Sequence, residues 1–175
     1  MSIISVEQLY FKYPNAKGNA VDGVSFGIEK GAYTAIVGSN GSGKSTLARL
    51  LCGLEKPLKG SISVQENQNL GIVFQSPKEQ IVSSIVYRDT AFGPKNLKLL
   101  NSEVELRTIE SLSVVDLLDK ANDSTSALSL GQTQKAALSG IIALHPEILI
   151  LDEAVSMLDP VSREEILEFL KRWQK

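Results

Sequence analysis

The sequence predicts an α/β fold, in which short strands alternate with helices. Two apolar runs, at residues 32–37 and 148–151, are short enough to be buried strands. Two longer runs, at residues 46–52 and 130–144, carry apolar residues at helical spacing. Alternation of this kind is typical of a sheet covered by helices. The length of 175 residues agrees with a single domain of roughly 150 residues.

The first part of the chain favours β structure. Residues 2–9 are rich in apolar and β-branched side chains, and residues 21–28 alternate with a period of two. Both patterns predict strands, and the loop between them contains Pro14 and Gly18. Further short strands are expected at residues 60–64 and 71–74.

The middle of the chain, residues 77–140, is helical and less regular. Residues 103–118 carry apolar side chains close to the 3.6-residue period, which predicts a helix. The predicted helix at residues 130–144 opens at Ser129, and a last helix begins at Pro160.

Composition excludes several classes of protein. Hydrophobic residues make up 43% of the chain and charged residues 22%, as in ordinary soluble globular proteins and not in disordered or collagen-like ones. The apolar runs are far shorter than the roughly 20 residues of a membrane span, and no charged-then-apolar leader opens the chain. A net charge of −2 gives no reason to expect a nucleic-acid partner. A single cysteine, Cys52, excludes an internal disulfide and suits a reducing cytoplasm.

The central motif of the sequence, at residues 38–46, predicts a loop that binds phosphates. Glycines let the backbone turn so that successive N–H groups face phosphate oxygens. Lys44 is expected to reach the β- and γ-phosphates, and Ser45 to place its hydroxyl on Mg²⁺. The helix that follows adds its positive N-terminal end. The pattern G-x-x-x-x-G-K-[ST] is matched in full, and the predicted site comprises Gly38, Ser39, Asn40, Gly41, Ser42, Gly43, Lys44, Ser45 and Thr46.

Two carboxylates follow the apolar run at residues 148–151. The carboxyl ends of strands in an open sheet are where ligands bind. Asp152 is therefore expected to hold Mg²⁺, and Glu153 to polarise the water that attacks the γ-phosphate.

These two motifs resemble those of P-loop NTPases, and further motifs resemble the ATP-binding cassette family. Residues 128–132 (LSLGQ) are similar to the signature motif LSGGQ, and residues 156–160 (SMLDP) to the segment that crosses the dimer interface. Gln75 is similar to the glutamine loop of that family, and Tyr13 to the aromatic residue that stacks on adenine. The resemblance covers essentially the whole chain in the family's order.

One subgroup of the family fits best. The runs at residues 73–77 (VFQSP) and 89–94 (DTAFGP), with Gln80 between them, resemble the ATPases of energy-coupling factor importers. Those proteins power uptake of cobalt, nickel and vitamins.

The resemblance implies a single, incomplete ATPase domain over residues 1–175. Residues 1–76 and 141–175 would form the nucleotide-binding core, a P-loop NTPase core with an N-terminal antiparallel β subdomain. Residues 77–140 would form the helical subdomain that carries the signature motif. The strand that leads to the family's switch residue would be missing, and we expect a truncated or split cassette whose remainder is absent or supplied by another chain.

The resemblance also implies a mechanism. Two cassettes, alike or different, face each other head to tail and close on ATP and Mg²⁺. Gln75 would sense Mg²⁺ and the attacking water, and Asp159 would couple the two sites across the interface. A transmembrane coupling subunit would contact residues 75–100 at the cytoplasmic face of the membrane, where this chain would be peripheral. The partner's γ-phosphate would be bound by Ser129, Gly131 and Gln132.

Three departures from the family pattern affect this mechanism. Leu130 replaces the second signature residue, a glycine, and is expected to crowd the partner's γ-phosphate or to bar a backbone angle open only to glycine. The stretch at residues 133–135 lacks the usual arginine-rich character. The switch histidine should follow Glu153 by roughly 30 residues, and the only histidine, His145, precedes it and is expected to be a loop or core residue.

Two other functions stay open. Without the switch histidine, the chain could be a module that binds ATP with little or no turnover. It could also be a soluble cassette protein of translation or repair, a class that normally carries two cassettes or long basic or coiled-coil insertions. The segment from Gln75 to Ser129 contains no charged heptad run, which favours the importer ATPase.

Overall fold

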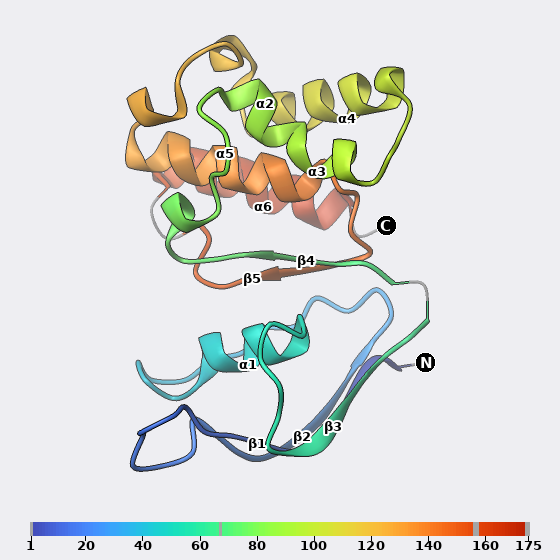
Figure 1. Cartoon of the computed structure of the whole chain (residues 1–175), viewed down its shortest axis with the longest axis vertical. Helices are drawn as coiled ribbons and strands as arrows, with labels where there is room; N and C mark the ends of the chain where they lie inside the picture. The colour runs from blue at the N-terminus through green and yellow to red at the C-terminus, as the bar shows by residue number, and fades with distance from the viewer. Residues whose placement is uncertain (1, 67, 156–157, 174–175) are drawn as a thin grey trace. The chain divides into compact units, whose positions relative to one another are not determined.

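The structure is a computed structural model, which describes residues 2–66, 68–155 and 158–173 (Figure 1). The chain forms two compact units, residues 1–68 and residues 69–175. Among the described residues, no helix is long and apolar enough to cross a bilayer.

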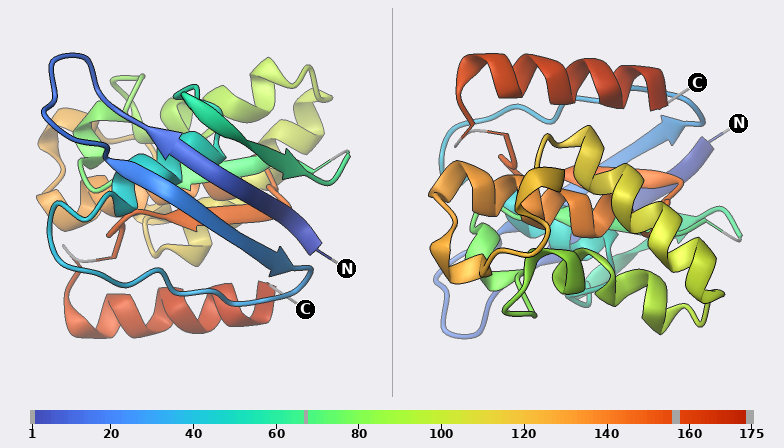
Figure 2. Two further views of the ribbon diagram at one scale, coloured as in Figure 1. Left: turned by 90° about the horizontal axis from the view of Figure 1, so that it is seen from below. Right: turned by 90° about the horizontal axis from the view of Figure 1, so that it is seen from above.

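The first unit is built on an antiparallel sheet, as the family resemblance implies. Strand β1 (Ser2–Phe11) lies between β2 (Val21–Glu29) and β3 (Lys59–Val64). Helix α1 (Lys44–Leu51) lies over this sheet (Figures 1 and 2).

A bulge in β1 keeps its apolar side chains buried along the whole strand. Ile4 and Val6 are buried, and after an irregularity in the pairing Leu9 and Phe11 are buried. The intervening Gln8 takes a left-handed backbone angle, with φ at 44°. One extra residue at a bulge reverses the alternation, so the apolar face continues inward.

The strand predicted at residues 32–37 does not form. These residues take no part in either sheet of the described chain, and the apolar side chains of Tyr33, Ile36 and Val37 are exposed. A strand is stabilised by the backbone of a neighbour and not by β propensity alone. This apolar run has no neighbouring strand in its unit, so the prediction of a buried strand is wrong for the described structure.

The second unit contains a two-stranded parallel sheet, β4 (Leu70–Val73) with β5 (Ile148–Leu151). Helices cover one side of this sheet (Figure 1). They are α2 (Val86–Thr90), α3 (Phe92–Asn96), α4 (Asn101–Val114), α5 (Leu130–Ile142) and α6 (Pro160–Trp173), and short 3₁₀ turns lie at Pro77–Glu79, Leu118–Lys120 and Thr125–Ala127.

Helix α5 lies at the centre of the core of the second unit. Its Leu138 is fully buried and belongs to one apolar cluster with Val73 of β4, Leu112 of α4 and Ile166 of α6. Burying a leucine completely contributes about 1.5–3 kcal/mol. The helices predicted at residues 130–144 and from Pro160 are confirmed with small changes at their ends.

Helix α4 ends earlier than the predicted helix at residues 103–118. Asp116 takes a left-handed backbone angle, with φ at 51°, and its N–H bonds to the carbonyl of Ser113. The N–H of Leu117 bonds to the carbonyl of Leu112. This pair of bonds is the Schellman motif, which closes a helix and turns the chain away. It buries Leu117 in the core, which continued helix would not do.

A buried carboxylate, Asp89, holds the start of the helical region. Its Oδ1 accepts the backbone N–H groups of Val82, at 2.7 Å, and Ser83, at 2.8 Å. Burial raises the pKa of Asp89 above its ordinary value, although the two hydrogen bonds lower it. The folded chain therefore binds this proton more tightly than the unfolded chain.

We expect Asp89→Asn to change how stability depends on pH. Because the pKa of Asp89 is raised in the folded chain, its contribution to the free energy of unfolding falls as pH rises above about 4. Asn keeps the Oδ1 acceptor but does not ionise, so the variant should gain stability relative to wild type as pH rises. Urea unfolding measured at pH values between 3 and 7 checks this, with Asp119→Asn, an exposed aspartate, as the control. Parallel pH curves for Asp89→Asn and wild type would show that the prediction is wrong.

Candidate functional site

The phosphate loop lies in the first unit and leads directly into α1. Lys44 donates hydrogen bonds from Nζ to the carbonyl oxygens of Gly38 and Ser39, both at 3.0 Å. The loop turns at Ser39, whose carbonyl accepts the N–H of Ser42 at 3.2 Å. The cation of Lys44 is thus held over the loop by two neutral acceptors. Phosphate oxygens would replace these acceptors with charged and stronger ones.

Gly43 lies where only glycine fits. It precedes the first residue of α1 with a left-handed φ of 93°, and its carbonyl accepts the N–H of Leu47 at 2.8 Å. A Cβ at Gly43 would collide with the carbonyl oxygen of Ala20. Glycine at position 43 therefore has a steric cause in this fold, and the role of the loop in binding phosphate stays a prediction.

Tyr13 lies next to the phosphate loop. Its hydroxyl is 3.3 Å from Oγ1 of Thr46. Its ring meets that of Phe11 edge-on, with centroids 4.8 Å apart and planes at 89°. The structure brings Tyr13 and the loop together, and adenine stacking on Tyr13 stays a prediction.

The second unit brings the acidic strand end and the glutamine loop together. Val73 pairs with Leu151 at the carboxyl ends of β4 and β5, and the carbonyl of Val73 accepts the N–H of Asp152 at 2.9 Å. Directly beyond the strands, Nε2 of Gln75 donates to Oε2 of Glu153 at 2.9 Å.

Glu153 has a strained backbone, with φ at 54°. A left-handed angle in a residue other than glycine costs roughly 1–2 kcal/mol. Strain of this kind persists where the surrounding structure requires it and gathers at functional sites.

Two further glutamines brace the strand that leads to Gln75. Gln80 accepts the N–H of Phe74 at 2.8 Å through Oε1 and donates from Nε2 to the carbonyl of Ile72 at 2.9 Å. Gln134 of α5 donates from Nε2 to the carbonyl of Phe74 at 3.4 Å. The sequence does not predict a site role for Gln134. The signal that could have identified Gln134 is a polar side chain at a position of the predicted helix that faces the core.

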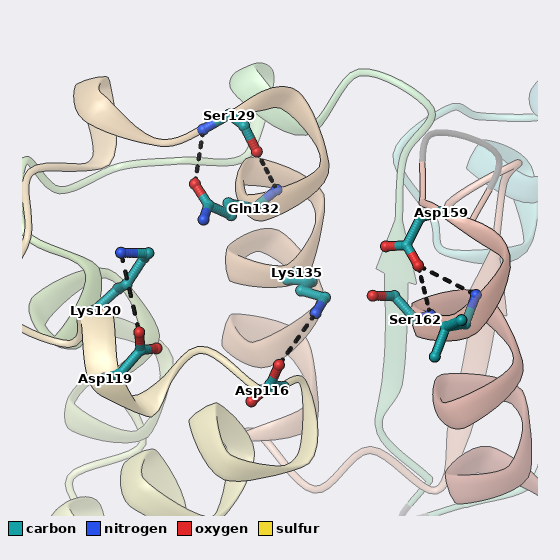
Figure 3. Close-up of polar contacts among 9 residues, drawn as sticks. Asp116, Asp119, Lys120, Ser129, Gln132, Lys135, Asp159 and Ser162 are labelled. Carbon is teal, nitrogen blue, oxygen red and sulfur yellow. Dashed lines mark hydrogen bonds and ion pairs between the residues drawn. The ribbon is translucent and has the colours of Figure 1, made fainter.

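The signature motif forms the N-terminus of α5. Ser129 Oγ accepts the N–H of Gln132 at 3.3 Å, and Oε1 of Gln132 accepts the N–H of Ser129 at 2.9 Å (Figure 3). This reciprocal pair is a capping box. Gly131 lies in the same first turn.

Leu130 opens α5 as its first residue, and its side chain is 47% exposed. Its backbone is helical and not left-handed. The expectation that leucine bars a backbone angle open only to glycine is therefore wrong here. The other expectation, that the side chain crowds a partner's phosphate, stays a prediction.

Asp159 lies at the start of α6. Its Oδ1 accepts the N–H groups of Val161, at 3.1 Å, and Ser162, at 3.0 Å, as an N-cap residue does (Figure 3). Hydrogen bonds from Ser162 hold the pKa of Asp159 below its ordinary value. Ser156 and Met157, which also belong to the segment resembling the dimer interface, lie outside the described residues.

His145 lies in the connection between α5 and β5, as expected of a loop residue. The described residues hold no group of three or more His, Cys, Asp or Glu that could bind a metal by themselves. Mg²⁺ at nucleotide sites needs only one or two protein ligands beside the phosphates.

The sequence and the fold of this chain are similar to those of known proteins. Residues 21–156 match the family described as ABC transporter. The energy-coupling factor transporter ATP-binding protein EcfA1 of Staphylococcus saprophyticus is 42% identical over 182 residues, covering 98% of this chain and 68% of that protein. EcfA1 of a bovine strain of Staphylococcus aureus is 41% identical, with the same coverage.

A solved structure shows the same fold. CbiO1 of Clostridium perfringens, described as part of the ABC transporter complex cbiONQ, superposes with a TM-score of 0.83 at 34% identity. The match covers 99% of this chain and 74% of CbiO1. The chain therefore belongs to the ABC transporter family, as an ATP-binding ATPase of the energy-coupling factor and CbiO type.

Proposed function

We propose that the chain is the motor subunit of an importer, in which ATP hydrolysis and dimer closure power uptake of a metal ion or a vitamin. The names of the staphylococcal relatives support an energy-coupling factor transporter, and the description of CbiO1 as part of a transporter complex supports membership of such a complex.

The observation that carries the proposal is the hydrogen bond between Gln75 and Glu153. A carboxylate can take a proton from the attacking water, and an adjacent amide can orient that water. Because the two residues follow adjacent parallel strands, the sheet itself sets the distance between them.

Nucleotide binding in this proposal starts at the phosphate loop. Lys44 binds the β- and γ-phosphates, and Tyr13 stacks on adenine. Mg²⁺ would be held by the hydroxyl of Ser45, the carboxylate of Asp152 and the amide oxygen of Gln75, which are the hard oxygen donors that this ion prefers. When bound, Mg²⁺ would neutralise charge on the phosphates.

A second cassette subunit, alike or different, completes the site in this proposal. Ser129 Oγ accepts from Gln132, so its hydroxyl proton remains to donate to the partner's γ-phosphate. The N–H of Gly131 and the amide of Gln132 lie in the same helical turn. Asp159, in addition to capping α6, would couple the two sites.

The transmembrane coupling subunit would contact residues 75–100, at the cytoplasmic face of the membrane. This segment exposes four large apolar side chains, which an apolar partner would bury. They are Val82, Phe92, Leu97 and Leu100, with exposed fractions of 61%, 50%, 51% and 78%.

We expect Glu153→Gln to keep ATP binding and to lose hydrolysis. Removing a general base lowers the rate by about 10²–10⁴-fold. Single-turnover hydrolysis of MgATP and equilibrium ATP binding check this, with Glu164→Gln, on the exposed face of α6, as the control. If wild type binds ATP but shows no turnover, the chain is a binding module. If Glu153→Gln hydrolyses at the wild-type rate, Glu153 is not the base.

We expect Leu130→Ala to speed hydrolysis at the partner's site by about tenfold, which corresponds to 1.4 kcal/mol of a restored phosphate contact. Alanine removes the crowding side chain and keeps helix propensity, whereas Leu130→Gly weakens the helix by about 1 kcal/mol. Hydrolysis by the assembled cassette dimer is measured for both variants. An unchanged rate in both would mean that Leu130 does not crowd the phosphate.

We expect Leu100→Glu to weaken binding to the transmembrane subunit by about tenfold or more, since a buried leucine contributes roughly 1.5–3 kcal/mol. Leu118→Glu, at a residue 42% exposed outside the segment 75–100, is the matched control. Co-purification from membranes and a binding titration measure the effect. If ATPase activity and membrane recruitment of wild type are both independent of any such subunit, the importer proposal fails.

A further inference from the structure

A buried glutamine connects the signature helix to the glutamine loop. Gln134 lies on α5 with no exposed surface, about one turn beyond the capping box of Ser129 and Gln132. Its Nε2 donates to the carbonyl of Phe74, the residue that precedes Gln75. Helix α5 and strand β4 are thus joined by a side chain as well as by apolar packing.

Glutamine is an energetically unfavourable residue at this buried position. Its Oε1 is buried and has no hydrogen-bond partner in the described structure. A buried acceptor without a partner destabilises the folded state, and an apolar side chain of the same length would avoid that cost. An unsatisfied buried polar group in a native fold therefore calls for a reason other than stability.

The reason lies in the backbone that Gln134 contacts. Gln80 accepts the N–H of Phe74 and donates to the carbonyl of Ile72. The N–H of Asp152 donates to the carbonyl of Val73. The carbonyl of Phe74 is the next acceptor along the chain, and Gln134 binds it. This carbonyl belongs to the peptide group that joins Phe74 to Gln75.

The orientation of that peptide group sets where the side chain of Gln75 points. Gln75 in turn donates to Glu153 at 2.9 Å. We propose that Gln134 is a positioning residue, which couples the place of the signature helix to the orientation of Gln75 and so to Glu153. This inference rests on the proposed ATPase function of Gln75 and Glu153.

The contact of Gln134 with Phe74 is long, at 3.4 Å, near the limit for a hydrogen bond. A small shift between α5 and β4 is therefore enough to break this contact or to shorten it to an ordinary hydrogen bond. A partner's phosphate that binds at the N-terminus of α5 would move this helix as a unit, and Gln134 would transmit the shift to Gln75.

The test is the variant Gln134→Met, which keeps the length of the side chain and removes the amide. Ser111→Ala is the matched control, because Ser111 Oγ of α4 is also buried without a partner. Both changes remove an unsatisfied polar atom. Gln134→Met also removes the donor to the carbonyl of Phe74, which offsets part of that gain, so the melting temperature of both variants should stay close to that of wild type. Gln134→Leu serves as the second variant should Gln134→Met fold poorly.

Two measurements separate positioning from a structural role. NMR of the Gln75 side-chain amide should show shifted or broadened signals in Gln134→Met and wild-type signals in Ser111→Ala. The single-turnover rate of MgATP hydrolysis should fall at least tenfold in Gln134→Met, with the ATP dissociation constant unchanged within twofold.

The outcomes distinguish this inference from the proposed function. Unchanged Gln75 signals in both Gln134 variants overturn the inference, whatever the hydrolysis rate. Shifted Gln75 signals with an unchanged hydrolysis rate overturn it as well, because the contact of Gln134 with Phe74 would then have no effect on hydrolysis. If wild type itself does not hydrolyse ATP, the proposed function fails, while the NMR comparison still decides whether Gln134 orients Gln75.

Discussion

The parallel pairing of β4 with β5 is the contact on which the proposed chemistry depends. It places the residues after Val73 and after Leu151 at one edge of the sheet, because parallel strands end on the same side. Gln75 and Glu153, 78 positions apart in the sequence, are within hydrogen-bond distance as a result. The apolar cluster of α4, α5 and α6 packs together with Val73 and keeps this short sheet in place.

Polar side chains inside the second unit hold the backbone where strands and helices cannot. Gln80 completes the bonding of the peptides around Phe74, and Asp89 binds the N–H groups of the loop before α2. Both bind backbone in irregular segments, where a buried N–H or carbonyl without a partner would be costly. Irregular segments around the glutamine loop are thus ordered by single side chains, and such segments can change shape when one contact changes.

The phosphate loop follows a different rule, since it is ordered by its own backbone. Gly43 supplies the left-handed angle that starts α1, and Lys44 folds back onto the carbonyls of the loop. A side chain from outside the loop also contributes, since the hydroxyl of Tyr13 lies 3.3 Å from Oγ1 of Thr46. A loop of this kind depends on local sequence more than on distant contacts, so its glycine and lysine pattern can be recognised in the sequence alone.

The sequence by itself determined the family, the order of most elements, the antiparallel first sheet and the residues of the phosphate loop, because these depend on local patterns and spacing. Tertiary structure decided the rest. It left residues 32–37 without a strand, since strands need a neighbour, and ended α4 at Val114, since Asp116 turns Leu117 into the core. It also paired Gln75 with Glu153 and buried Gln134 against Phe74. Contacts between residues so far apart in the sequence depend on how the elements pack, and no local pattern encodes them.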